Sequence, residues 1–266
     1  MNGRSLLLTQ GKLIPTESPK ILIFDIETSP LEALSWGPKW KTNLIKVTQP
    51  SRVMCFSAKW FGGKQVTAGW PDYPGYVAGE KDDREIVKDI WMLIDAADII
   101  VAHNGRSFDL RTMNSRFIAH GLPLPSPYKL VDTKVQVKKV VRLPSNSLED
   151  IGDYYGLGHK LPHQGFKLWE DCLAGDPEAW KTMKAYNHND VSLLEKIYVT
   201  FRPWMAHPNM ALYDKDGSVC CTTCGSHNYI KSKLRENLTT LSRQYKCKDC
   251  GHYFSETRSL VRAPVK

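Results

Sequence analysis

The chain has 266 residues, of which 42% are hydrophobic and 24% are charged, and its formal net charge at pH 7 is +8. This length and apolar content can bury one core of about 200 residues and still carry a small module, so several large domains are excluded. Residues 211–266 hold 10 Lys/Arg against 5 Asp/Glu, a balance that suits a polyanionic partner such as nucleic acid but also fits a solvated basic face.

The N-terminal segment contains one short apolar run, the three leucines at 6–8. This run is too short for the core of a secretory signal and much too short to span a bilayer. We therefore expect a cytoplasmic protein without a membrane partner.

The first predicted strand carries two carboxylates. Residues 20–26 (KILIFDI) form a continuous apolar run, typical of a strand buried on both faces of a sheet. Asp25 and Glu27 lie two positions apart, so both side chains project toward the same side. An unpaired ionised group beside apolar residues costs several kcal/mol and favours a cation or an equally good partner. The β-branched and aromatic stretch at 52–70, interrupted by two glycines, predicts a hairpin that continues the sheet.

The next segments predict a helix, a strand and a second helix. Apolar residues recur at helical spacing in 84–97, and the DIIVAHN run that follows is typical of a buried strand. A second helical pattern follows and ends at Gly121, with Asp109 at its start. Taken alone, Asp109 is best explained as a first-turn charge that meets the positive end of the helix dipole.

Residues 131–160 predict a further helix beginning at Ser147, because Asp150 follows three residues later. Asp132 could in principle join the metal site, but a capping or partnered aspartate is the better explanation of this residue. Four basic residues before this helix suit contact with phosphates, and a solvated face explains them equally well: Lys134, Lys138, Lys139 and Arg142.

The last long helix is predicted at about 177–201. Tyr186 and Asp190 lie four residues apart within it, so they share one face, one turn from each other. A phenol in that position reaches a water held by the carboxylate's metal. A hydrogen-bonded surface pair would have the same spacing.

Near the C-terminus, two C-x-x-C pairs predict a zinc ribbon. Cys221 and Cys224 are followed after 22 residues by Cys247 and Cys250, and this clustering signals metal rather than disulfides. The neighbouring Cys220 is left out because the two-residue gap favours Cys221. The segment between the pairs should form strands, and its basic residues and two tyrosines favour nucleic-acid binding over protein binding or simple bracing of the terminus. They are Lys231, Lys233, Arg235, Arg243, Lys246, Tyr229 and Tyr245.

Three segments, FDIET at 24–28, HNGRSFDL at 103–110 and YNHND at 186–190, resemble in order and separation the motifs of the DEDD superfamily of 3′→5′ exonucleases. The resemblance covers roughly residues 18–203. It extends to the proofreading exonuclease of family-B DNA polymerases and to predicted stand-alone exonucleases. Tyr186 matches the tyrosine subclass (DEDDy), whereas the histidine subclass would have histidine in place of Ala185.

The resemblance implies a ribonuclease-H-like fold and a site for two Mg²⁺ or Mn²⁺ ions. Asp25 would bridge both ions, Glu27 and Asp190 would hold the ion that binds the attacking water, and Asp109 would serve the second ion. Tyr186 would orient the attacking water. Carboxylates suit these hard cations, and a pair of ions serves both the attacking and the leaving oxygen.

Two residues are candidate substrate contacts. Asn104 matches an asparagine that lies near the terminal nucleotides in the polymerase exonucleases, and Thr28 follows the metal-binding strand. A turn-forming asparagine and a strand-end threonine are equally good explanations of these positions.

Together these features predict an α/β chain with three parts: a DEDDy exonuclease domain at 18–203, a linker at 204–217 and a ribbon at 218–258 that binds one structural Zn²⁺. We expect a DNA 3′→5′ exonuclease that releases nucleoside 5′-monophosphates. An RNA or short-oligonucleotide exonuclease with the same site is the alternative, and a nucleic-acid-binding protein with little catalysis is an alternative of another class. A proofreading role would require a polymerase or another replication or repair protein as a partner.

Overall fold

In the computed structural model of the chain, which describes residues 6–9, 12–15, 18–38, 43–215, 217–256 and 260–262, the apolar run at 20–26 forms the central strand of a five-stranded sheet. The sheet has the order β7-β6-β3-β8-β9. β3 pairs antiparallel with β6 and parallel with β8, so the sheet is mixed, as predicted. Its strands are β3 (Ile21–Thr28), β6 (Val53–Trp60), β7 (Gln65–Gly69), β8 (Ile99–Ala102) and β9 (Lys129–Asp132).

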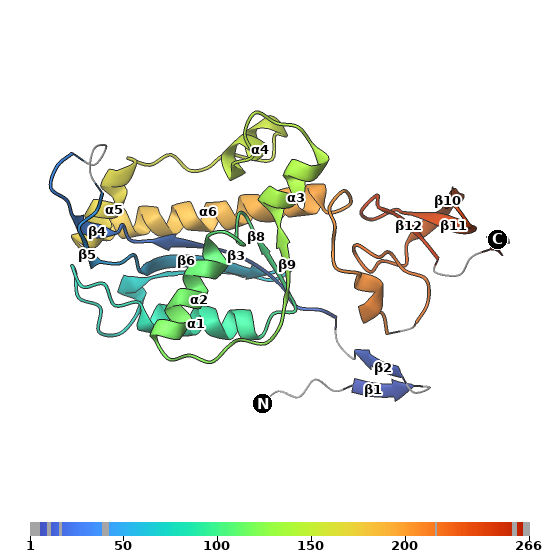
Figure 1. Cartoon of the computed structure of the whole chain (residues 1–266), viewed down its shortest axis with the longest axis horizontal. Coiled ribbons are helices and arrows are strands. Elements are labelled where there is room, and N and C mark those ends of the chain that lie inside the picture. The colour runs from blue at the N-terminus through green and yellow to red at the C-terminus, as the bar shows by residue number, and fades with distance from the viewer. Residues whose placement is uncertain are drawn as a thin grey trace. The chain divides into compact units, whose positions relative to one another are not determined.

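The chain consists of two compact units, each with most of its residue contacts inside itself. The larger unit comprises Lys20–Lys138 and Leu143–Ile197, and the smaller unit comprises the remainder of the chain. In the larger unit, helices cover both faces of the sheet (Figure 1). The α/β architecture predicted from the sequence, a mixed central sheet flanked by helices, is confirmed.

The two faces of β3 have different roles because successive side chains of a strand point to opposite faces. Leu22, Phe24 and Ile26 join the core cluster that also contains Ile90 of α1 (Arg84–Asp95) and Met113 of α2 (Asp109–Ala119). Asp25 and Glu27 alternate with them and therefore project to the opposite face. There Asn187 of α6 (Pro177–Phe201) donates a hydrogen bond to Asp25.

The predicted helices are present close to their expected positions. Helices at 84–97, 108–121 and 177–201 are confirmed, and the Ser147 side chain accepts a hydrogen bond from the Asp150 backbone N–H at 3.1 Å, as the helix-start pattern predicted. Within the described ranges, no helix is both long and apolar enough to cross a membrane. The helices are α1 (Arg84–Asp95), α2 (Asp109–Ala119), α3 (Thr133–Val140), α4 (Leu148–Tyr154), α5 (Phe166–Leu173), α6 (Pro177–Phe201) and the 3-10 turns η1 (Trp70–Asp72) and η2 (Met210–Tyr213).

Among the described residues, the strands outside the central sheet form two two-stranded sheets and one four-stranded sheet. A two-stranded pair in the larger unit follows β3, and another lies near the N-terminus. In the smaller unit, the segment between the two cysteine pairs forms two long antiparallel strands, as predicted. These strands are β1 (Leu6–Thr9), β2 (Lys12–Pro15), β4 (Glu32–Leu34), β5 (Lys46–Gln49), β10 (Tyr229–Glu236), β11 (Thr240–Cys247), β12 (Tyr253–Ser255) and β13 (Val261–Arg262).

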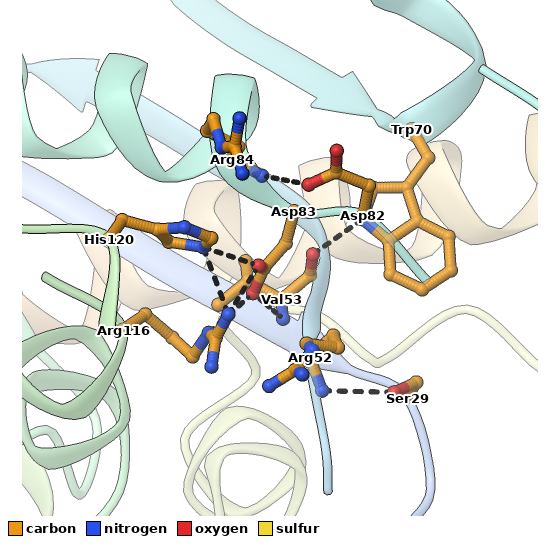
Figure 2. Close-up of polar contacts among 9 residues, drawn as sticks. All are labelled: Ser29, Arg52, Val53, Trp70, Asp82, Asp83, Arg84, Arg116 and His120. Atoms are coloured by element: carbon orange, nitrogen blue, oxygen red, sulfur yellow. Dashed lines mark hydrogen bonds and ion pairs between the residues drawn. The ribbon is translucent and has the colours of Figure 1, made fainter. Parts of the chain in front are cut away.

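A buried charge cluster ties α1 and α2 to the sheet beside the end of β3 (Figure 2). Asp83, which is 1% exposed, accepts hydrogen bonds from Arg116 Nε and Nη2, both at 2.7 Å, and contacts His120 Nε2 at 2.8 Å. It also accepts from the backbone N–H of Val53, the residue that pairs with Thr28. Burial favours the neutral acid, but the hydrogen bonds from Arg116 and His120 outweigh it and lower the pKa of Asp83.

Replacing Asp83 is expected to destabilise the larger unit. Asp83→Ala leaves the Arg116 guanidinium buried without its bidentate partner, and such a loss typically costs about 3–5 kcal/mol in the free energy of unfolding. Urea denaturation of the full chain measures this cost. Asp82→Ala is the matched control, because the exposed Asp82 accepts only a backbone N–H bond from Arg84 among the described residues, and the loss of such a bond costs about 1 kcal/mol. Equal losses of unfolding free energy in the two variants would contradict the stabilising role assigned to the ion pair of Asp83 with Arg116.

Candidate active site

Three carboxylates from β3 and α6 meet on one face of the sheet. Oxygen atoms of Asp25, Glu27 and Asp190 all lie within 4.8 Å of one another. The D-x-E spacing directs the first two side chains to the face that α6 covers, and Asp190 reaches the same point from that helix. Asp190 is only 2% exposed. The structure therefore brings together three of the four acidic residues identified in the sequence.

The fourth acidic residue, Asp109, lies beside this group without belonging to the set within 4.8 Å. It is the first residue of α2 and is buried. Its Oδ1 accepts a hydrogen bond from the Ile26 backbone N–H at 3.3 Å, and Ile26 lies between Asp25 and Glu27. Asp109 is thus both a first-turn residue, as its position alone suggested, and a direct neighbour of the acidic strand.

The carboxylates oppose one another's ionisation. Burial raises the pKa of Asp25 well above its ordinary value, and repulsion from Asp109 and Glu27 adds to this effect. Burial and the charge of Asp190 raise the pKa of Glu27 to about 8, and burial raises that of Asp109 to about 7. Burial also raises the pKa of Asp190, although Lys160 acts in the opposite direction. A divalent cation supplies the positive charge that allows such a group to ionise together.

The carboxylate oxygens of Asp190 are suited to bind a cation. Its Oδ2 accepts a hydrogen bond from Lys160 Nζ at 2.6 Å, whereas its buried Oδ1 has no hydrogen-bond partner among the residues that the structure describes. A buried carboxylate oxygen without a partner is costly. Because carboxylate oxygens are the ligands that Mg²⁺ and Mn²⁺ prefer, the cluster can bind divalent metal.

Tyr186 is held beside the acidic group by packing and by Lys160. Its hydroxyl accepts a hydrogen bond from Lys160 Nζ at 2.7 Å. Edge-on contacts with His163 and Trp169, with ring centroids 4.8 and 6.5 Å away, fix the ring. Burial raises the pKa of Tyr186 to about 12, so the phenol is neutral at pH 7. Burial would lower the pKa of Lys160, but the ion pair with Asp190 outweighs it and raises that pKa, so the ammonium stays charged.

Lys160 and Asn187 are two members of the site that sequence reasoning missed. Asn187 Nδ2 donates to Asp25 Oδ2 at 2.7 Å, and Cys55 Sγ donates to Asn187 Oδ1 at 3.9 Å. Asn187 was detectable, because it precedes Asp190 by three residues and so shares its helical face. Lys160 lies between helices, 30 residues before Asp190, and no local pattern connects the two.

The candidate substrate contacts lie at the ends of β3 and β8. The Thr28 carbonyl accepts a hydrogen bond from Trp169 Nε1 at 3.1 Å. Asn104 has φ of +67°, a left-handed conformation that asparagine tolerates better than most residues, and its N–H donates to Asp132. Asp132 also accepts the backbone N–H groups of Arg106 and Val135, so the partnered role expected for it is confirmed. Contact of Thr28 or Asn104 with substrate remains a prediction.

The four paired cysteines form a second metal-binding group. One ligand atom from each of Cys221, Cys224, Cys247 and Cys250 lies within 4.8 Å of the others, and the closest sulfur pairs are 3.6 Å apart. All four are free thiols, and tetrahedral Zn–S bonds of about 2.3 Å place sulfurs about 3.8 Å apart. The arrangement is consistent with zinc. Cys220 is buried but lies outside the group, as the spacing predicted.

Comparison with known proteins identifies a family for most of the larger unit. A model of the RNase_H superfamily, RNase_H_2, matches residues 42–202, a stretch that includes Asp109 and Asp190 and begins after β3. The structure is similar to that of the family B DNA polymerase from the hyperthermophilic archaeon Pyrobaculum calidifontis, with a TM-score of 0.53 and 15% identity. This similarity covers 85% of the chain but only 32% of the polymerase, and at this identity it shows the fold alone. The search of curated proteins gave no match.

Proposed function

The chain belongs to the RNase H superfamily, and from this membership we propose that it is a metal-dependent 3′→5′ exonuclease acting on single-stranded ends of DNA. Its products would be nucleoside 5′-monophosphates. The observation that carries the proposal is the meeting of Asp25, Glu27 and Asp190, together with a buried Asp190 oxygen that has no partner among the described residues. Such a group has little structural benefit and a direct use in metal-assisted hydrolysis.

Each member of the site has an assigned role in this proposal. Asp25, Glu27, Asp109 and Asp190 would hold two Mg²⁺ or Mn²⁺ ions. Ions bound there would supply a more acidic attacking water and charge stabilisation for the leaving 3′-oxygen. Asn187 fixes one oxygen of Asp25 through its hydrogen bond and thereby orients the carboxylate.

Tyr186 positions the nucleophile in this proposal. Its neutral hydroxyl accepts a hydrogen bond from the charged Lys160, so its own proton can be donated to an oxygen at the reaction centre, such as the carboxylate of Asp190, whose pKa a hydrogen bond with Tyr186 lowers. The contacts with His163 and Trp169 hold the ring in one place, so the donor is oriented before substrate arrives.

Tyr186→Phe is expected to lower kcat by about 10- to 1,000-fold, the range for loss of a proton-transfer or positioning group. The ring and its packing remain, so the unfolding free energy and the affinity for Mg²⁺ should change little. Single-turnover release of nucleotide measures the rate, and Tyr154→Phe, at an exposed tyrosine of α4, is the control. Full activity of Tyr186→Phe would remove Tyr186 from the mechanism.

The function itself is tested by parallel digestion of labelled substrates with Mg²⁺ or Mn²⁺. With a 3′-labelled single DNA strand, labelled mononucleotide should appear at once, whereas a 5′-labelled strand should shorten in steps. Mass analysis should identify the product as a nucleoside 5′-monophosphate. Binding without release would support the non-catalytic alternative, and faster digestion of RNA than of DNA would reassign the substrate.

A further inference from the structure

One face of the ribbon sheet presents a row of side chains that its own fold does not use. Ile230 of β10 pairs with Lys246 of β11, and Lys246 pairs with Tyr253 of β12. Directly paired residues project to the same face, so the three side chains form a row across three strands. Ile230 and Tyr253 are 46% and 48% exposed, and Lys246 Nζ lies 5.6 Å from the centroid of the Tyr253 ring.

The opposite face of the same strands carries the structural core. Tyr245 pairs with Phe254, and Tyr229 pairs with Cys247. Tyr245, Phe254 and Cys247 are buried in one cluster with Cys221, and Tyr229 packs against it. Because this face supplies the metal ligand Cys247 and the aromatic packing, the exposed row on the other face is not needed to form the ribbon. Tyr229 and Tyr245, which the sequence suggested for contact with nucleic acid, belong to this packing, so that part of the expectation is wrong.

The ribbon carries a positive charge that its own acidic residues do not neutralise. Between residues 229 and 256 there are six basic residues and three acidic ones. Of the acidic residues, Asp249 accepts hydrogen bonds from Ser226 and Asn228, and Glu256 accepts one from Tyr245. None of the six basic residues forms an ion pair with a residue in the described ranges: Lys231, Lys233, Arg235, Arg243, Lys246 and Lys248.

We propose that the exposed row of Ile230, Lys246 and Tyr253 binds a single strand of nucleic acid, with the Tyr253 ring stacked on a base and Lys246 on an adjacent phosphate. An unpaired base offers its face to an aromatic ring, and Lys246, which lies beside the Tyr253 ring without an ion-pair partner in the described ranges, can contact a neighbouring phosphate. The unneutralised charge favours a polyanion over a protein partner. The inference rests on the proposed function in one respect: the bound strand is taken to be the strand that is digested.

Binding is measured by fluorescence anisotropy with a labelled single-stranded DNA, in full-length chains that carry Asp25→Ala so that the probe stays intact. Tyr253→Ala should weaken binding by about 5-fold or more, the lower end of the range for loss of one stacked base, while Tyr253→Phe should bind within about 2-fold of the parent. Lys246→Gln should reduce the slope of log K against log salt by about 0.7. Lys88→Gln removes the same charge from an exposed position on α1 and should leave binding unchanged.

The outcomes separate this inference from the proposed function. If the Tyr253→Ala and Lys246→Gln chains retain their zinc and bind like the parent, the inference is overturned and the row is open to a protein partner. If they bind weakly while the wild-type chain releases no nucleotide, the inference stands and the exonuclease proposal fails. A single-stranded RNA probe should show the same losses as DNA, because stacking and phosphate contact are common to both, whereas losses on duplex DNA alone would contradict the stacking role.

Discussion

Asp25→Asn is expected to lower kcat for nucleotide release by at least about 10³-fold, which corresponds to about 4 kcal/mol of transition-state stabilisation. The substitution keeps the shape of the side chain and an oxygen that can still accept the hydrogen bond from Asn187. It removes a negative charge that Asp109, Glu27 and Asp190 all oppose. The unfolding free energy of the metal-free chain should therefore stay constant or rise while activity is lost.

This opposite movement of activity and stability distinguishes a metal ligand from a structural residue. Affinity for Mn²⁺, measured by calorimetry, should fall together with kcat. Asp171→Asn serves as the control, because Asp171 is a carboxylate of the same unit whose partner is the Lys167 side chain on α5. Near-normal activity of Asp25→Asn would end the metal assignment, and a loss of stability without a loss of metal affinity would assign Asp25 to the core instead.

The elements that bear the site could be predicted because their patterns are strong over short distances. β3 is a continuous apolar run up to Asp25 and ends in Glu27 and Thr28, and α6 repeats apolar residues over 25 positions. The spacing of Asp25 and Glu27 follows from the period of a strand, and that of Tyr186 and Asp190 follows from the pitch of a helix. Local geometry alone determines both pairs.

The remaining features depend on tertiary contacts or on weak local patterns. Lys160 reaches Asp190 and Tyr186 only because the chain returns to α6 from a segment with no regular structure. The strand pair β4–β5 was not predicted, and β5 shows no alternation of buried and exposed residues from which a strand could be inferred. β9 has four residues and pairs on one side with β8, so its sequence carries little signal.

Asp109 shows how a weak local signal gains meaning from the fold. Its sequence position explains it as the first residue of a helix, and it does begin α2. The parallel pairing of β3 with β8 places the start of the following helix at the same end of the sheet as Asp25. The hydrogen bond from Ile26 then places its carboxylate next to the acidic strand, so helix position and proximity to the site have one structural origin.

Loss of zinc is expected to unfold the ribbon in the full chain. A four-thiolate site in a peptide of this kind contributes about 10–16 kcal/mol of binding free energy, and the cluster of Tyr245, Phe254 and two cysteines is too small to replace it. A zinc-selective chelator in excess Mg²⁺ should therefore remove the contribution of Tyr245 to the near-ultraviolet circular dichroism spectrum. Digestion of a very short oligonucleotide by the acidic site should persist, because that site lies within the larger unit.

Two adjacent cysteines make the zinc prediction specific. Cys221→Ser should lose most of its zinc by metal analysis, because Cys221 belongs to the four-thiol group. Cys220→Ser should retain it, because Cys220 is equally buried but lies outside that group. Equal zinc loss in both variants would show that burial of a thiol, rather than coordination, stabilises this turn. Zinc loss in Cys221→Ser but not in Cys220→Ser would show that the C-x-x-C spacing, which selects Cys221 over Cys220, reflects the coordination geometry of the ion.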